Sequence, residues 1–190
     1  ILEKGGNVFD AMVATDLALS VAYPYAGSIG GGGFMVYRLN NGEVGSLDFR
    51  EKAPLAASRD MYLDENGEVI PNMSTLGAMA VGVPGGIAGV FAAHEKFGTL
   101  PISELIQPVI ELAKKGVVVT KKQEDRIKHY QPNFPKANKD SIPFDKVWKE
   151  NDTIKYPELA ETLTRIMNNG RDEFYKGETA KRFVQFMQDN

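Results

Sequence analysis

Arg50 is the residue of this chain whose type and position best fit a binding site. It follows a predicted strand, stands next to Glu51 and precedes Ala53 and Pro54, so it lies where a strand passes into a loop. A guanidinium stays charged at neutral pH and offers paired N–H donors that match a carboxylate. The position therefore predicts either a clamp for the carboxylate of an amino-acid substrate or a structural ion pair with Asp48 or Glu51.

A run of glycines, Gly30 to Gly33, is the second feature that invites a functional interpretation. Glycine-rich loops that hold phosphate follow a strand and open a helix, whereas here a helix is predicted before the glycines and a strand after them. The Gly-Lys-Ser/Thr that completes a P-loop is also missing. We therefore expect the glycines to allow close packing of the main chain rather than to bind a nucleotide.

The other residues that could do chemistry form no recognisable set. His94 and His129 have no carboxylate or histidine at the spacing of a metal site, and no Gly-x-Ser-x-Gly elbow is present. The sequence contains no Cys, which excludes a thiol nucleophile, a disulfide and thiolate ligands, and leaves the redox compartment open. We therefore expect no cofactor, no metal ion and no self-contained catalytic set.

Three elements must position Arg50 and the glycines. Asn7 can cap a helix that runs to about residue 23 and whose mostly apolar surface predicts burial. Two strands, 34–39 and 44–49, are joined by an Asn-Gly turn, which is a strong hairpin signal. Both faces of the first strand are mainly apolar, so the sheet should be covered on both sides in a helix–sheet–helix layering.

The rest of the chain is predicted to be largely helical. The expected elements are a turn at 64–67, a loop at 71–77, a short strand at 78–83, helices at 87–97, 102–115 (interrupted by Pro108), 121–130, 157–169 and 178–188, and a long loop at 131–151. The start, Ile1 to Gly6, has the pattern of a last helical turn with a glycine stop, and the end has no stop signal. We therefore expect a fragment whose natural protein begins further upstream.

The composition favours a globular domain, or a large part of one. Of the 190 residues, 43% are hydrophobic and 25% are charged, and the net charge is −3 with both signs interspersed. No surface for nucleic acid is therefore expected. The longest apolar runs fall far short of the roughly 20 residues that cross a bilayer.

Several motifs, in one order, together resemble the gamma-glutamyltranspeptidase family. They lie at 5–11, 30–34, 48–54, 81–85, 94–100, 108–116 and 174–177, and so span nearly the whole chain. Several motifs in the correct order are far more specific than any one of them. One departure is local: the family commonly has Ser-Gly-Ile-Gly-Gly-Gly, where residues 27–32 read Gly-Ser-Ile-Gly-Gly-Gly.

The resemblance implies an α/β (α+β) fold, the αββα sandwich of the N-terminal nucleophile hydrolases. Residues 1–190 would form a partial large-subunit domain with peripheral helices, truncated at both ends relative to the family. Such proteins are made as precursors that cleave themselves into a large and a small subunit. The cut frees a threonine whose amino group can act as base while its hydroxyl attacks the donor amide.

The resemblance also assigns a role to Arg50, because the arginine of the family's Arg-Glu-x-Ala-Pro motif binds the α-carboxylate of the γ-glutamyl group. Glu51 would orient Arg50, help to receive the α-amino group, or form an ordinary salt bridge. The Thr-Thr-His-aromatic-Ser start of the small subunit occurs nowhere, and Thr75 is internal, so no catalytic residue is expected in this chain and it should be inactive alone. The implied partners are the small subunit of the same precursor, a donor such as glutathione, and an amino acid or water as acceptor, in the periplasm or outside the cell.

Other functions on the same fold remain open at the level of sequence. A poly-gamma-glutamate transpeptidase or a glutaryl-cephalosporin acylase would share this scaffold but act on another acyl group. A non-catalytic homologue, or a binding module built on the large-subunit fold, belongs to a different class of protein.

Overall fold

The first long helix begins at the cap that its sequence provides. In the computed structural model, which describes all 190 residues, α1 (Val8–Ala22) follows Asn7, whose side chain accepts hydrogen bonds from the amides of Phe9 and Asp10. Asp10 in turn accepts one from the Asn7 amide at 2.9 Å. This reciprocal capping box confirms the predicted start of the helix.

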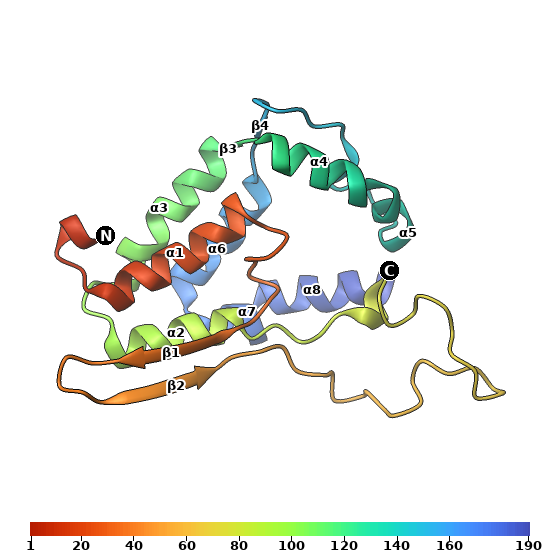
Figure 1. Cartoon of the computed structure of the whole chain (residues 1–190), viewed down its shortest axis with the longest axis horizontal. Coiled ribbons are helices and arrows are strands. Elements are labelled where there is room, and N and C mark those ends of the chain that lie inside the picture. The colour runs from red at the N-terminus through yellow and green to blue at the C-terminus, as the bar shows by residue number, and fades with distance from the viewer. The chain divides into compact units, whose positions relative to one another are not determined.

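The chain divides into two compact units. The first unit comprises residues 1–52, 83–117 and 155–180, and the second comprises 53–82, 118–154 and 181–190. The elements of the first unit are the 3-10 helix η1 (Leu2–Lys4), α1, β1 (Phe34–Arg38), β2 (Val44–Asp48), α2 (Gly86–Phe97), α3 (Ile102–Lys115), α6 (Pro157–Asn169) and α7 (Arg171–Lys176) (Figure 1). Gly5 ends η1 in a left-handed conformation with φ of 86°, which confirms the predicted glycine stop.

The core of the first unit forms around α3, which packs against α1 on one side and α6 on the other. Its fully or almost fully buried side chains include Val13, Leu17, Val21, Ile87, Val90, Leu105, Ile106, Val109, Ile110, Leu163 and Ile166. The predicted interruption at Pro108 is wrong, because α3 continues unbroken through it. Pro108 lies on the exposed side, and the buried residues before and after it hold the helix together across the missing hydrogen bond.

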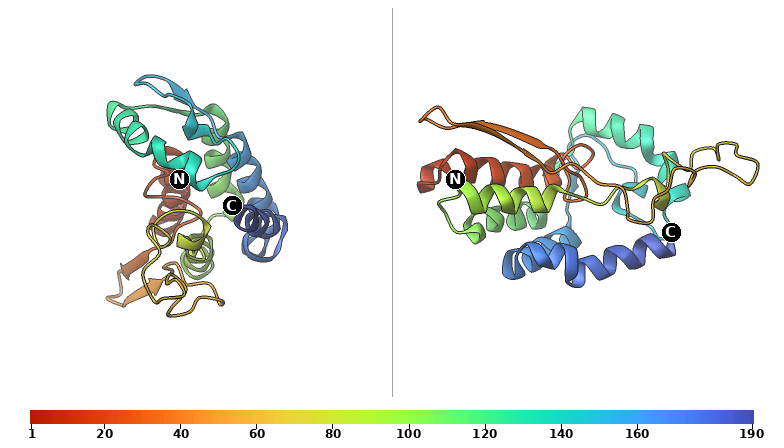
Figure 2. Two further views of the ribbon diagram at one scale, coloured as in Figure 1. Left: turned by 90° about the vertical axis from the view of Figure 1, so that its right-hand side faces the viewer. Right: turned by 90° about the horizontal axis from the view of Figure 1, so that it is seen from below.

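The predicted hairpin is confirmed. β1 and β2 are antiparallel, with Phe34 opposite Asp48 and Arg38 opposite Val44. Figures 1 and 2 show α1 and α2 side by side, with the hairpin along one side of them. The residues that face these helices are half-buried, whereas the alternate residues are exposed.

The predicted covering of the sheet on both sides is not found within this chain. Phe34, Val36 and Val44 on the outer face are 61%, 83% and 68% exposed. The reason is that the chain supplies helices for one face of the hairpin only.

The second unit contains short elements. They are the 3-10 helix η2 (Ala78–Ala80), α4 (Lys121–Tyr130), η3 (Gln131–Asn133), α5 (Phe134–Ala137), η4 (Pro143–Asp145) and β4 (Thr153–Ile154). β3 (Val117–Val118), which pairs with β4, and α8 (Glu178–Asp189) each have residues in both units. The helices predicted at 87–97, 121–130, 157–169 and 178–188 are confirmed to within a residue at either end. None of the helices is both long and apolar enough to cross a bilayer.

Two predictions for the irregular regions are wrong. Residues 78–80 of the predicted strand form η2, and only Val83 pairs, with Lys52, in an isolated antiparallel bridge. The predicted loop at 131–151 contains η3, α5 and η4, each with a proline in its first turn, where a helix needs no N–H donor. A contact across this stretch, from the Gln131 side-chain amide to the Asp145 carbonyl oxygen at 2.8 Å, is not visible in a local pattern.

Candidate functional site

Arg50 lies two residues beyond the end of β2 and is exposed. Its amide donates a hydrogen bond to Oδ1 of Asp48 at 3.0 Å, which bends the main chain away from the strand. The guanidinium carbon lies 5.9 Å from the centre of the Phe34 ring. Arg50 forms no ion pair, so the structural pair with Asp48 or Glu51 that the sequence left open is not present.

The main chain on both sides of Arg50 is anchored. Phe49 exchanges two hydrogen bonds with Gly33, of 3.0 and 3.3 Å, which extend the hairpin ladder by one pair. Lys52 exchanges two with Val83, of 3.1 and 2.7 Å. Arg50 and Glu51 therefore lie between two anchored positions and present exposed side chains on a main chain that is held in place.

Glu51 is exposed and forms no ion pair, so the ordinary salt bridge predicted for it is absent from this chain. Its Oε1 lies beside the glycine run, 3.5 Å from where a Cβ on Gly31 would be. A carboxylate and a guanidinium thus stand on consecutive residues at one edge of the hairpin. The guanidinium can donate to a carboxylate, and the carboxylate can accept from an amino group.

The glycine run packs closely on this edge, as expected from its order between a helix and a strand. The carbonyl oxygen of Gly31 accepts hydrogen bonds from the amides of Gly85 and Gly86 at 3.0 and 2.8 Å. A Cβ on Gly32 would lie 2.8 Å from the amide nitrogen of Glu51. The run therefore brings the start of α2 against the main chain that carries Arg50.

One residue that contacts this region was not found from sequence. The Tyr175 hydroxyl on α7 donates to the Pro84 carbonyl oxygen and accepts from the Ala88 amide, both at 3.0 Å, and burial raises the pKa of Tyr175. The second bond caps α2, which has no side-chain cap of its own. The sequence gives only indirect evidence for this contact. Pro84 and Gly85 precede α2 where a capping Ser, Thr, Asp or Asn would normally stand, so another group must bond to the first amides of the helix.

Neither histidine joins the site. Nε2 of His94 lies 2.8 Å from the carbonyl oxygen of Leu100, and His129 is exposed with its ring 4.8 Å from that of Tyr130. No group of three or more His, Asp or Glu side chains is placed to hold a metal ion. His94 therefore makes a main-chain contact within the fold, and His129 packs beside a neighbouring ring at the surface.

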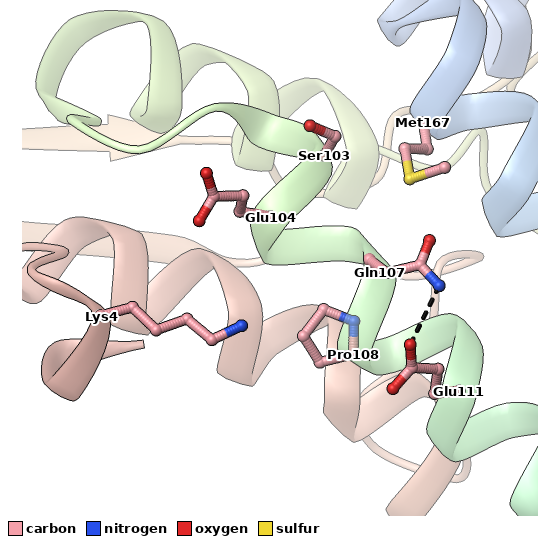
Figure 3. Close-up of a pocket in the computed structure, with 7 residues that line it drawn as sticks. All are labelled: Lys4, Ser103, Glu104, Gln107, Pro108, Glu111 and Met167. Atoms are coloured by element: carbon pink, nitrogen blue, oxygen red, sulfur yellow. Dashed lines mark hydrogen bonds between the residues drawn. The ribbon is translucent and has the colours of Figure 1, made fainter.

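A pocket of about 340 Å³ lies on another side of the first unit (Figure 3). It is lined by Lys4, Ser103, Glu104, Gln107, Pro108, Glu111 and Met167. The hydrogen bond drawn within it joins Nε2 of Gln107 to Oε1 of Glu111 at 3.1 Å. Since α1 and α2 lie between α3 and the hairpin, this pocket is separate from Arg50.

The family model described as Gamma-glutamyltranspeptidase matches residues 1–190. The glutathione hydrolase proenzyme of Pseudomonas aeruginosa is 47% identical over 190 residues, which cover 100% of this chain and 34% of that protein. The solved gamma-glutamyltranspeptidases of Helicobacter pylori and Pseudomonas nitroreducens match with TM-scores of 0.94 and 0.90 at 42% and 46% identity, over 100% of this chain and 55% and 56% of theirs.

These structural matches show that the chain forms part of a domain with the N-terminal nucleophile hydrolase fold, as the resemblance implied. The chain belongs to the gamma-glutamyltranspeptidase family. It spans about a third of the length of the curated relatives that it matches. Those relatives are proenzymes, which implies a precursor that is cleaved into subunits.

Proposed function

We propose that the complete protein is a gamma-glutamyltransferase and glutathione hydrolase, and that this chain contributes scaffold and the donor-binding Arg50. The observation that carries the proposal is an unpaired guanidinium on an anchored main chain, within the motif at 48–54 that resembles the family's. The match of the whole chain to glutathione hydrolase proenzymes supports it. Arg50 binds the α-carboxylate of the γ-glutamyl group, and Glu51 receives its α-amino group.

The chemistry belongs to a threonine that is absent from this chain. In the family's reaction the threonine hydroxyl oxygen attacks the γ-carbonyl carbon, and the threonine amino group takes the hydroxyl proton and passes it to the leaving amine. Water or an amino acid then attacks the acyl-enzyme and releases the glutamyl group. Arg50 favours the attack of the threonine by holding the γ-carbonyl group of the donor in the correct position. Its contribution is therefore to binding and orientation rather than to bond breaking.

The partner that fits the hairpin is the small subunit of the same precursor. Phe34, Val36 and Val44 present a row of apolar side chains on a face that this chain leaves uncovered. A two-stranded hairpin is marginal by itself and gains stability when further strands or another layer join it. The second sheet of an αββα sandwich would supply this cover. By family resemblance, the assembled enzyme is periplasmic or secreted.

Two chromogenic donors that differ by one group test the proposed function. A γ-glutamyl amide carries both the α-carboxylate and the α-amino group, whereas a glutaryl amide lacks the amino group. The complete protein should turn over the γ-glutamyl amide with kcat/KM at least 10-fold higher, because an unpaired polar group in the site costs about 1.4 kcal/mol or more. Equal or better turnover of the glutaryl amide would instead establish the acylase, and no turnover of either by matured protein would establish a non-catalytic homologue.

A further inference from the structure

We infer that Gly32 and Gly85 are positioning residues for Arg50, because they pack against the main chain of residues 49–51 from two sides. Tyr175 stabilises this arrangement through its hydrogen bonds to the turn that contains Gly85. This inference rests on the proposed role of Arg50 in donor binding. It assigns a function in substrate recognition to two glycines and a tyrosine that touch no substrate themselves.

Gly32 lies against the main chain on one side. A Cβ at this position would overlap the Phe49 carbonyl oxygen and would lie 2.8 Å from the Glu51 amide nitrogen and 2.9 Å from the Arg50 carbonyl carbon. All of these atoms are backbone, so no side-chain rotation can relieve the overlap. Any residue other than glycine at Gly32 must therefore displace the segment that carries Arg50.

Gly85 lies against the same segment. A Cβ at Gly85 would overlap the Phe49 carbonyl oxygen and would lie 2.9 Å from the Arg50 carbonyl oxygen. The amide of Gly85 also donates to the Gly31 carbonyl oxygen at 3.0 Å, which ties the two glycine segments to each other. The main chain of Phe49 and Arg50 is thus enclosed by backbone atoms that have no freedom to rotate away.

Tyr175 fixes the second of these segments. Its hydroxyl bridges the Pro84 carbonyl oxygen and the Ala88 amide, the residues on either side of the turn into α2 that contains Gly85. Both bonds are 3.0 Å long and the ring is half-buried, so the bridge is partly shielded from water. Loss of the hydroxyl would free this turn without changing the shape of the side chain.

Such rigidity matters because an exposed arginine binds a carboxylate well only if its backbone is already in place. A bidentate pair needs both N–H donors in register with both oxygens. A displacement of about 1 Å in a positioning group can lower catalytic efficiency by about 100-fold. The close glycine packing prevents such displacement at Arg50.

The test is kinetic and uses the complete, matured protein with a γ-glutamyl amide donor. Gly32→Ala should raise the donor KM and lower kcat/KM by roughly 10- to 100-fold. The matched control is Gly30→Ala, two residues away, where the nearest atom to an added Cβ is Oγ of Ser28 at 3.7 Å. The control variant should keep wild-type kinetics, and an unchanged donor KM in Gly32→Ala would overturn the inference.

A double-mutant cycle separates positioning from general damage. In an Arg50→Ala background, Gly32→Ala should cause little further loss of kcat/KM, because the group that it positions is already gone. An equal fold-loss in both backgrounds would show that Gly32 does not act through Arg50 and would overturn the inference. A donor KM that Arg50→Ala leaves unchanged would instead refute the proposed function itself.

Tyr175→Phe covers the case in which Gly32→Ala fails to mature. This variant keeps the ring and removes only the bridge between Pro84 and Ala88. We expect a several-fold rise in the donor KM with kcat little changed, and no such rise in the Arg50→Ala background. Wild-type donor KM in Tyr175→Phe, or the same rise in both backgrounds, would show that the bridge does not serve Arg50.

Discussion

Arg50 carries a charge that no side chain of this chain neutralises. A ligand carboxylate can therefore pair with it without first breaking an existing ion pair. The Phe34 ring, 5.9 Å away, and the hydrogen bond between the Arg50 amide and Asp48 limit where the residue can lie. At the scale of single residues, the donor binding that we propose depends on an available guanidinium whose main chain is held in place.

Replacing Arg50 in the complete protein should weaken donor binding more than it weakens the chemical step. In Arg50→Ala the donor's α-carboxylate loses its paired N–H groups, so the donor KM should rise by the equivalent of about 2–5 kcal/mol. Arg50→Lys should restore little, because an ammonium lacks the planar fork. Steady-state kinetics measure this, with the acceptor KM as internal control. If both variants keep the wild-type donor KM, Arg50 is not the clamp.

Arg50 and the glycine run could be singled out from sequence as candidates because their residue types and their order along the chain are local signals, whereas the donor-binding role of Arg50 is implied by the family resemblance and stays a prediction. Gly85 and Tyr175 could not be identified in the same way. Their contacts join segments that are far apart in the sequence, and a glycine or tyrosine alone does not reveal which main-chain atoms lie against it. Which main-chain segments approach each other closely is determined by the tertiary fold, so it cannot be inferred from the type of a single residue.

Among the elements, α1 is tied to the connection between α2 and α3 by one buried carboxylate. Asp10 is 0% exposed and accepts from the Thr99 amide at 3.0 Å, the Thr99 hydroxyl at 2.5 Å and the Asn7 amide at 2.9 Å. Burial raises the pKa of Asp10, but the hydrogen bonds from Thr99 and Asn7 outweigh burial and hold this pKa below its ordinary 3.8. The ionised form is therefore the one that the fold stabilises.

Asp10→Asn should lower the free energy of unfolding by about 1–3 kcal/mol at neutral pH, because an amide cannot accept all of these bonds. The folded pKa lies below the unfolded one, so the stabilisation by Asp10 is complete above the ordinary value of 3.8 and is lost as the pH falls through the folded value. Thermal unfolding of the protein and the variant at pH 7 and pH 3 should show a difference that shrinks in acid.

Asp16→Asn is the matched control on the same helix. Burial raises the pKa of Asp16, so its ionised form is disfavoured by the fold, the opposite of Asp10. Neutralising it should not destabilise the protein at pH 7. A loss equal to that of Asp10→Asn, or a loss in Asp10→Asn that is independent of pH, would contradict the role given to the buried carboxylate.

The regular elements were predictable where their signals were local. The capping box at Asn7 and the Asn-Gly turn of the hairpin each lie within a few residues, and both are confirmed. The strand expected at 78–83 failed because a strand depends on a partner, and only Lys52 offers one, to Val83. The helical turns within 131–151 were missed because a cluster of polar residues and prolines was taken as a loop signal.

At the scale of the whole molecule, the outer face of the hairpin should be needed for assembly. Val36→Asp places a charge among exposed apolar side chains, where it should block the docking of a covering layer in the complete precursor. The expected result is impaired self-cleavage or dissociated subunits, measured by denaturing gels and size-exclusion chromatography, together with loss of γ-glutamyl amide turnover.

Val36→Thr is the matched variant, since it keeps the β-branched shape and the preference for strands. It should mature more completely than Val36→Asp. The isolated 190-residue chain should release no product from the same amide at all. Normal maturation of Val36→Asp would show that the exposed face is not an assembly surface, and turnover by the isolated chain would show that the reaction does not require the missing threonine.

The bridge between Lys52 and Val83 has a consequence for the variation of this protein. Because Lys52 and Val83 are hydrogen-bonded to each other, residues 53–82 form a long connection whose two ends lie side by side next to Arg50. The cost of closing such an excursion changes only slowly with its length. Lengthening, shortening or exchanging this segment should therefore leave the hydrogen bonds that anchor the main chain around Arg50 intact, so 53–82 is a segment whose length can vary without disturbing that anchor.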